Sequence, residues 1–444
     1  MFIIFAKNKD KNAMKKAITS ALLLLCIVFS ASAQTGTWSG KLDVQDVKIN
    51  IVFHLDGEEP TMDVPDQAAQ GIPIQVERSD MGKLTIKIPM LGASYEGLWL
   101  GKQVVGTFLQ NGASLPLTLT PGAEKLNRPQ TPVGPFPYAT EEITFSNGDA
   151  VLAGTLVLPQ GYSRKTPVLI FVTGSGQEDR DETIFEHKPF AVIADALGRA
   201  GIATLRFDDR GVGGSTGDVV NATTVDFKDD ALAGIKLLRE RFDKVGVIGH
   251  SEGGTIALML AAEKQADFIV SLAGVAVSGL ETIVAQSRVG LIAAGYSGDT
   301  VDKYCDAVQK ACYVRVHGGR MPFPDELDLP DELKKNYQAV ITQIQSPWMI
   351  KFLSLDMRPL LGGITCPVLA LNGTKDIQVE HESNLGALRS GLPTNPKNKI
   401  VALEGLNHLF QHCTTGAVAE YRDIEETFAP EALGMMIQWL SDMK

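Results

Sequence analysis

The chain has 444 residues, 44% of them hydrophobic and 21% charged, which is typical of a globular protein large enough for two or three domains. This hydrophobic content argues against disorder over most of the length. The formal net charge of −11 makes binding to nucleic acid or to an anionic lipid surface a poor expectation.

Residues 1–33 predict a secretory signal peptide. Two lysines precede an apolar run at residues 21–29, and the sequence SASAQ then has the form of a cleavage site before Gln34. The run is short for a membrane span, so a retained anchor is the less favoured reading. Removing residues 1–33, which hold five lysines and one aspartate, would change the formal charge to −15. We expect an exported protein, periplasmic or extracellular, without a stable membrane span.

The cysteines predict neither a metal site nor an obvious disulfide. Export permits disulfides, but Cys305 and Cys312 on one helix would have Cα atoms roughly 10 Å apart, which is too far to bridge. Cys366 and Cys413 show no metal-binding spacing either. We interpret these residues as mostly buried small apolar side chains.

Residues 34–126 are predicted to form a small all-β domain. Hydrophobic and polar residues alternate in the stretches 47–55, 84–88 and 115–119, which is the period of half-buried strands. Its aromatic residues could form a sugar-binding platform, although core packing is the favoured interpretation. These aromatic residues are Trp38, Trp99 and Phe108. Residues 127–138 are rich in proline and predict a semi-rigid linker.

From residue 139 to 444 strands alternate with helices, which predicts an α/β fold with a doubly wound, mainly parallel sheet covered on both faces. Predicted strands are 151–158, 167–173, 203–208, 245–249, 268–273, 368–372 and 400–403, and predicted helices are 189–200, 225–242, 381–392 and 430–443. The alternation stops between about residues 278 and 361. An insertion of that length after a strand is expected to cover something.

The pattern "GHSEG" at residues 249–253 lies between a predicted strand and a predicted helix, which is the arrangement of a nucleophile elbow. The sharp turn would hold Ser251 in a strained conformation with its hydroxyl above the sheet edge. Glycines are needed on both sides because Cβ atoms there would collide with the strand and the helix. Ser251 is therefore the candidate nucleophile.

A serine hydroxyl needs a base to accept its proton, and the base needs a carboxylate to fix its tautomer. Asp376 follows the predicted strand 368–372, and His408 follows the strand 400–403. Both side chains are expected at the edge of the sheet where Ser251 lies. His412 is a less favoured alternative base, and His250 is expected to point into the fold.

The candidate site also needs donors for the oxyanion. The oxyanion of an acyl-transfer reaction needs backbone donors, and we expect these to be Glu252 and, from the loop TGSG, Ser175 or next Gly176. The neighbouring segment 177–182, QEDRDE, could bind a polar group, but it is interpreted as a solvated loop. Asp208 and Asp209 precede the elbow in the chain, whereas the acid follows the nucleophile in chain order when a strand–turn–helix elbow carries the serine. They are expected to pair with Arg210.

Three other histidines are expected at the surface or lining a pocket. These are His187, His317 and His381.

The segments "VTGSGQEDRD", "RFDDRGVGGSTG", "GVIGHSEGG", "LALNGTKD" and "GLNHLF" together resemble the α/β-hydrolase superfamily, close to exported bacterial serine esterases with an N-terminal β module. The resemblance covers about residues 139–444. It implies Ser251 as nucleophile, Asp376 as acid and His408 as base. It also implies that the insertion 278–361 is a helical cap, in which Trp348 and Phe352 would line an acyl pocket.

The expected activity is hydrolysis of a small-molecule carboxylic ester through an acyl-enzyme, without a metal or an organic cofactor. Two alternatives stay open. A peptidase could use the same three side chains, and a glycan- or lipid-binding protein could keep the fold without the chemistry. Neither the natural substrate nor the oligomeric state follows from the sequence.

Overall fold

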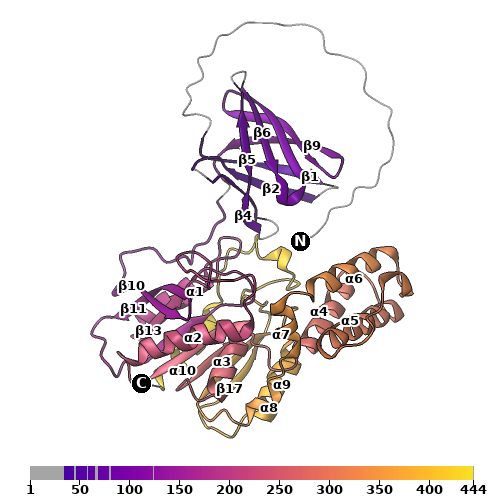
Figure 1. Ribbon diagram of the computed structural model, residues 1–444. Coiled ribbons are helices and arrows are strands. Elements are labelled where there is room, and N and C mark those ends of the chain that lie inside the picture. The colour runs from indigo at the N-terminus through magenta and orange to yellow at the C-terminus, as the bar shows by residue number, and fades with distance from the viewer. Residues whose placement is uncertain are drawn as a thin grey trace, which may run out of the picture. The chain divides into compact units, whose positions relative to one another are not determined.

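The computed structural model describes residues 35–443 apart from 45–46, 58, 66–68, 80–81 and 124, so the predicted signal peptide lies outside the described residues. The described residues form two compact units, of which the first ends at Leu126 and the second begins at Asn127 (Figure 1).

The first unit is an antiparallel sheet of nine described strands in the order β4-β3-β2-β1-β9-β8-β7-β6-β5. Its side chains alternate between core and solvent, as the sequence predicts. Trp38, Trp99 and Phe108 are all buried, and the rings of Trp38 and Trp99 meet edge to face at 4.6 Å. The core-packing interpretation is therefore confirmed. The strands are β1 (Thr37–Val44), β2 (Val47–His54), β3 (Thr61–Val64), β4 (Ala69–Pro73), β5 (Gln75–Arg78), β6 (Lys83–Ile88), β7 (Ala93–Leu100), β8 (Gln103–Gln110) and β9 (Ala113–Pro121).

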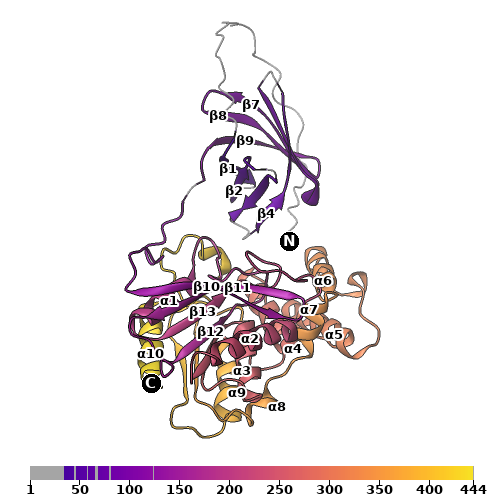
Figure 2. The same ribbon diagram turned by 60° about the vertical axis from the view of Figure 1, so that its left-hand side comes forward.

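The second unit contains a sheet with the order β10-β11-β13-β12-β14-β15-β16-β17. Figure 2 labels its strands β10, β11, β13 and β12. β10 and β11 form an antiparallel hairpin, β11 is antiparallel to β13, and the strands from β13 to β17 are parallel. The predicted mainly parallel sheet is confirmed. The strands are β10 (Tyr138–Asn147), β11 (Ala150–Pro159), β12 (Val168–Val172), β13 (Ala203–Phe207), β14 (Val245–His250), β15 (Ile269–Leu272), β16 (Val368–Gly373) and β17 (Lys399–Leu403).

Helices cover both faces of this sheet. Leu169 and Phe171 of β12 pack in one apolar cluster with α1 (Pro189–Arg199) and α10 (Pro430–Ser441). Their neighbour Ile170 packs in the other cluster with α2 (Thr224–Arg239), α3 (Glu252–Ala262) and α9 (His381–Gly391). Because both faces are covered, the strands are continuous apolar runs and not alternating ones.

A group of helices lies between β15 and β16 in the chain and forms the predicted cap, with an apolar core of its own. The first of these helices begins after Ser278, whose hydroxyl accepts a hydrogen bond from the amide of Glu281 at 3.1 Å. Such an N-cap fixes where the helix starts. The helices are α4 (Gly279–Ala293), α5 (Asp299–His317), α6 (Asp331–Gln343), α7 (Pro347–Ser354) and α8 (Arg358–Leu361).

The proline-rich segment 127–138 belongs to the second unit and is held there by side-chain hydrogen bonds. Arg128 donates to the carbonyl oxygens of Phe185 and Ile424, and Gln130 donates to that of Phe428 at 2.8 Å. These contacts to residues far along the chain hold the segment against the α/β unit.

Candidate active site

Ser251 lies at the junction of β14 and α3 with φ of +53° and ψ of −116°. A positive φ is strained for any residue with a Cβ atom and is found where the surrounding structure enforces it. The amide of Ser251 donates to the carbonyl oxygen of Leu272 at 2.8 Å, and its own carbonyl accepts from Gly254 at 3.0 Å. The structure therefore has the sharp strand-to-helix turn that the sequence predicts.

The glycines of the elbow are required by its packing. A Cβ atom on Gly249 would lie 1.9 Å from the carbonyl oxygen of Gly253. A Cβ atom on Gly253 would lie 2.0 Å from the carbonyl oxygen of Val172 in β12. Both neighbours are backbone atoms, which cannot move away as a flexible side chain could.

We expect Gly253→Ala to lower the free energy of unfolding by about 3 kcal/mol or more, because overpacking against backbone cannot be relieved locally. Gly290→Ala is the matched control: Gly290 lies inside α4, and beyond its chain neighbours and the backbone of its own helix no atom lies within 4 Å of an added Cβ. Alanine there should stabilise the helix by up to about 1 kcal/mol. Denaturant titration of both variants measures the difference. Equal stability of Gly253→Ala and the wild type would contradict this packing.

Asp376 and His408 are brought together as the sequence predicts. The Nδ1 atom of His408 lies 2.7 Å from Oδ2 of Asp376, and both side chains are buried. The other carboxylate oxygen of Asp376 accepts the amides of Gln378 at 2.8 Å and Val379 at 2.9 Å. The carboxylate is thus fixed by its own loop through Oδ1, and Oδ2 orients the imidazole.

The loops that carry these residues cross closely at the carboxyl ends of parallel strands. A Cβ atom on Gly373, the last residue of β16, would lie 2.1 Å from the carbonyl oxygen of Leu406. Asn407 holds the next turn, since its Oδ1 atom accepts the amides of Leu409 and Gln411 at 3.0 and 2.9 Å. This buried asparagine is a site residue that the sequence analysis missed.

The alternative histidines lie elsewhere. His412 is paired with Glu426 at 2.9 Å and Glu431 at 3.0 Å. His250 is buried, as predicted, and its ring centroid lies 4.6 Å from that of His408. His187 is fully buried, with Nδ1 2.8 Å from the hydroxyl of Thr427, so the expected surface position is wrong. Burial lowers the pKa of His187 to about 4, which keeps the ring neutral.

The expected oxyanion donors lie at the start of α3 and in the loop after β12. Glu252 is the first residue of α3, where helix amides have no partner within the helix. In the loop, the amide of Gly174 is already bonded to the carboxylate of Glu182 at 2.7 Å. This leaves Ser175 and then Gly176, with φ of +147°, as the candidates for the second donor.

The side chain of Glu252 connects the elbow to the cap. Its carboxylate is buried, and both oxygens lie 2.9 Å from the indole nitrogen of Trp348 in α7. The ring of Trp348 in turn stacks on Phe352 at 5.5 Å. Burial raises the pKa of Glu252. Trp348 therefore has a polar role at the elbow, and contact of Trp348 or Phe352 with an acyl group stays a prediction.

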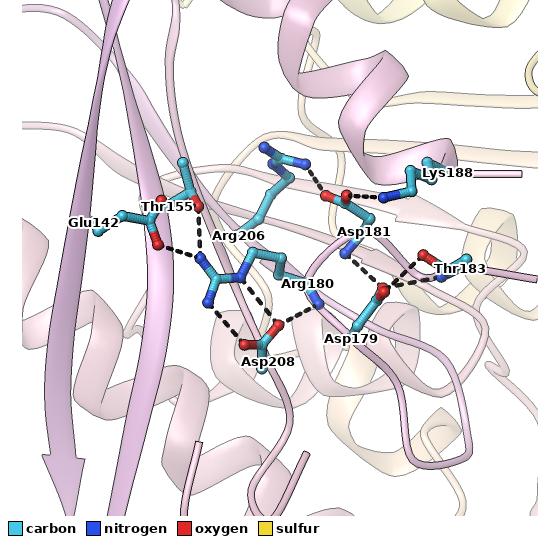
Figure 3. Close-up of polar contacts among 9 residues, drawn as sticks. All are labelled: Glu142, Thr155, Asp179, Arg180, Asp181, Thr183, Lys188, Arg206 and Asp208. Atoms are coloured by element: carbon cyan, nitrogen blue, oxygen red, sulfur yellow. Dashed lines mark hydrogen bonds and ion pairs between the residues drawn. The ribbon is translucent and has the colours of Figure 1, made fainter. Parts of the chain in front are cut away.

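The segment 177–182 is not a solvated loop, because it is built into a network of ion pairs (Figure 3). The guanidinium of Arg180 donates to both oxygens of Asp208 at 3.0 and 2.7 Å. It also donates to Glu142 at 2.6 Å and to Thr155 at 2.7 Å. Asp208 thus pairs with Arg180, and the predicted pairing with Arg210 is wrong for it.

The predicted pairing with Arg210 is wrong for Asp209 as well. Arg210 donates to both oxygens of Asp230 in α2, at 2.8 and 2.6 Å. Asp209 is buried and accepts from the hydroxyl of Thr173 at 2.8 Å and the amide of Glu178 at 3.1 Å. Burial raises the pKa of Asp209 to about 8, and burial together with neighbouring carboxylates does the same for Glu178.

Among the described residues, no group of three or more histidine, cysteine, aspartate or glutamate side chains is arranged to hold a metal ion. The four cysteines within the described ranges are all unpaired. In the same part of the chain, no helix has the length and apolar character to cross a membrane.

Comparison with known proteins shows the family of this chain. The sequence profile of the alpha/beta hydrolase family matches residues 169–420, more than half of the chain. The chain is also similar to Esterase EstD of Thermotoga maritima, with 29% identity over 283 residues that cover 62% of this chain and 61% of that protein. It thus spans less than two thirds of the length of this relative.

The solved structures to which this chain is similar include Est1E from Butyrivibrio proteoclasticus, with a TM-score of 0.39 and 19% identity over 68% of this chain and 99% of that one. Another is proline iminopeptidase from Mycobacterium smegmatis, with a TM-score of 0.43 and 15% identity over 68% and 98% of the two chains. The profile match spans the strands and loops that carry Ser251, Asp376 and His408. The chain belongs to the alpha/beta hydrolase family.

Proposed function

We propose that this protein is a serine hydrolase that cleaves carboxylic esters through an acyl-enzyme. The observation that carries the proposal is the 2.7 Å contact between His408 and Asp376, at the sheet edge where the strained elbow holds Ser251. The similarity to a relative named as an esterase supports the choice of esters.

In the first half of the proposed reaction, His408 accepts the proton of Ser251 as the serine oxygen attacks the ester carbonyl carbon. The negative charge that develops on the carbonyl oxygen would be stabilised by the amides of Glu252 and Ser175. The bond to the alcohol then breaks, and the alcohol leaves with the proton from His408. An acyl group remains bonded to Ser251.

In the second half, water attacks the acyl carbon and gives its proton to His408. The bond to the serine oxygen breaks, the proton returns to Ser251, and the carboxylic acid leaves. Asp376 holds the Nδ1 proton of His408 throughout, so that Nε2 is free to accept and donate. Every step uses only the side chains and amides of this chain.

The test compares chromogenic esters of increasing acyl length with an aminoacyl anilide. We expect turnover of short-chain esters and little turnover of the anilide. A fluorophosphonate probe should label Ser251 stoichiometrically, as peptide mass spectrometry can show. Faster anilide cleavage would favour a peptidase, and a folded protein that neither turns over esters nor reacts with the probe would contradict the proposal.

A further inference from the structure

A second histidine–carboxylate pair lies behind the proposed reacting groups. The Nδ1 atom of His250 lies 2.9 Å from Oε1 of Glu182. Both residues are almost fully buried, with 6% of His250 and 5% of Glu182 exposed. The proposed reaction assigns neither of them a role, although His250 directly precedes Ser251.

This pair contacts three of the loops that form the proposed site. The Nε2 atom of His250 lies 2.9 Å from the carbonyl oxygen of His408. The same Oε1 atom of Glu182 that faces His250 also accepts the amide of Gly174 at 2.7 Å. A Cβ atom on Gly174 would lie 3.4 Å from Cβ of Ser251 and 3.6 Å from Nδ1 of His250. The pair therefore links the oxyanion loop, the elbow and the loop of His408.

The segment that carries Glu182 is rigidly built. Glu182 has φ of +54°, a strained conformation for a residue with a side chain. Asp179 accepts the amides of Asp181 and Thr183 at 2.9 and 3.1 Å on either side of it. The ion pairs of Arg180 hold the segment against the sheet (Figure 3). These contacts hold the backbone on both sides of Glu182 in place.

Hydrogen bonding indicates the charge of His250. Both ring nitrogens face acceptors, a carboxylate oxygen and a carbonyl oxygen, so both must carry a proton if both bonds are made. Burial by itself lowers the pKa of His250, but the charge and hydrogen bond of Glu182 outweigh it and raise the pKa to about 9. The other titratable groups around the ring are Glu178, Asp376 and His408.

We propose that Glu182 and His250 form a buried carboxylate–imidazolium pair that positions the reacting groups of the hydrolase. The carboxylate holds the amide of Gly174 and thereby the next residue, Ser175. The imidazolium holds the backbone of His408, whose side chain must reach Ser251. The positioning role rests on the proposed function, whereas the ionic state of the pair does not.

Glu182→Gln tests the two links, from Glu182 to the amide of Gly174 and from His250 to the backbone of His408. Without the negative charge of Glu182, burial favours the neutral ring of His250, which carries a single proton. A glutamine oxygen at the same place can then accept from both Gly174 and Nδ1 only if that proton is on Nδ1. The Nε2 lone pair would then face the carbonyl oxygen of His408. One of the links must break, and a displacement of about 1 Å in a reacting group lowers rates by roughly a hundredfold.

The kinetic experiment measures kcat and KM for a short-chain ester. We expect Glu182→Gln and His250→Gln to lower kcat about 10- to 100-fold and to change KM less than about 3-fold, because binding groups are untouched. Glu426→Gln is the matched control, since it removes the carboxylate of the exposed His412 pair and should leave kcat unchanged. Circular dichroism melting confirms that each variant is folded.

The second experiment tests the ionic state without depending on the kinetics of a variant at the pair. Ring-nitrogen NMR of the histidines is recorded at about pH 8 in the wild type and in Glu426→Gln. One histidine should keep the chemical shifts of an imidazolium in both proteins. The control is included because Glu426→Gln removes a carboxylate beside His412, another histidine with acidic neighbours. This signal should disappear in Glu182→Gln if that variant folds.

The two experiments separate the possible failures. If no imidazolium signal persists at about pH 8, the ionic pair is wrong whatever the kinetics show. If the signal persists and the wild type turns over esters, a folded Glu182→Gln with wild-type kcat contradicts the positioning role. If the signal persists in a protein without ester turnover, the proposed function fails and the positioning role fails with it, while the ion pair stands.

Discussion

Replacing Ser251 with alanine is expected to lower kcat for ester hydrolysis roughly a millionfold, the usual cost of losing a serine nucleophile that acts as a unit with its base. Alanine keeps the Cβ atom, so the backbone conformation at φ of +53° stays as strained as before. The hydroxyl is the only atom lost. Turnover of a chromogenic ester, together with thermal melting, measures both effects.

The control for this substitution is Ser390→Ala. Ser390 lies on α9, is exposed, and its hydroxyl donates to the carbonyl oxygen of Gly386 in its own helix at 2.9 Å. Its loss should leave both kcat and the melting temperature nearly unchanged. A folded Ser251→Ala that keeps more than about 1% of wild-type turnover would show that another group attacks the ester.

The sequence predicts the α/β unit well because its central strands are continuous apolar runs. Buried on both faces, β12 and β14 to β16 cannot be mistaken for exposed segments. β10 escapes detection for the opposite reason. It is an edge strand, mostly exposed or half-buried along its length, and it is recognised only by its hairpin pairing with β11.

The candidate site is predictable where a residue's place in a motif fixes its position. Ser251, Asp376 and His408 each follow a strand, and the ends of parallel strands meet at one edge. Charge pairs between loops are not fixed in this way. Arg180 and Arg210 each have several carboxylates within reach in sequence, and only the fold decides that they pair with Asp208 and Asp230.

The same argument applies to aromatic and buried acidic residues. An aromatic residue in a cap predicts an apolar wall, yet Trp348 also has a donor nitrogen that a buried carboxylate can bind. Glu182 stands in a run of charged residues, which predicts exposure. Its burial follows from contacts with His250 and Gly174, which lie in other parts of the chain. Local composition carries no signal for such contacts.

Asp376→Asn is expected to lower kcat about ten thousandfold without unfolding the protein, because it favours the wrong tautomer of His408. The asparagine oxygen can keep the amides of Gln378 and Val379, which hold it in the place of the aspartate. Its amide nitrogen then faces Nδ1 of His408 as a donor. The ring responds by carrying its proton on Nε2, where it can no longer accept the proton of Ser251.

This effect is measured by comparing kcat and KM of Asp376→Asn with those of a control variant, Asp423→Asn. Asp423 has the same chemistry at a position where 82% of its side chain is exposed, so its replacement should change neither constant. KM of Asp376→Asn should stay within about threefold of the wild-type value, since the tautomer affects proton transfer more than binding. A folded Asp376→Asn with a tenth or more of wild-type kcat would mean that the 2.7 Å contact with His408 serves only to stabilise the fold.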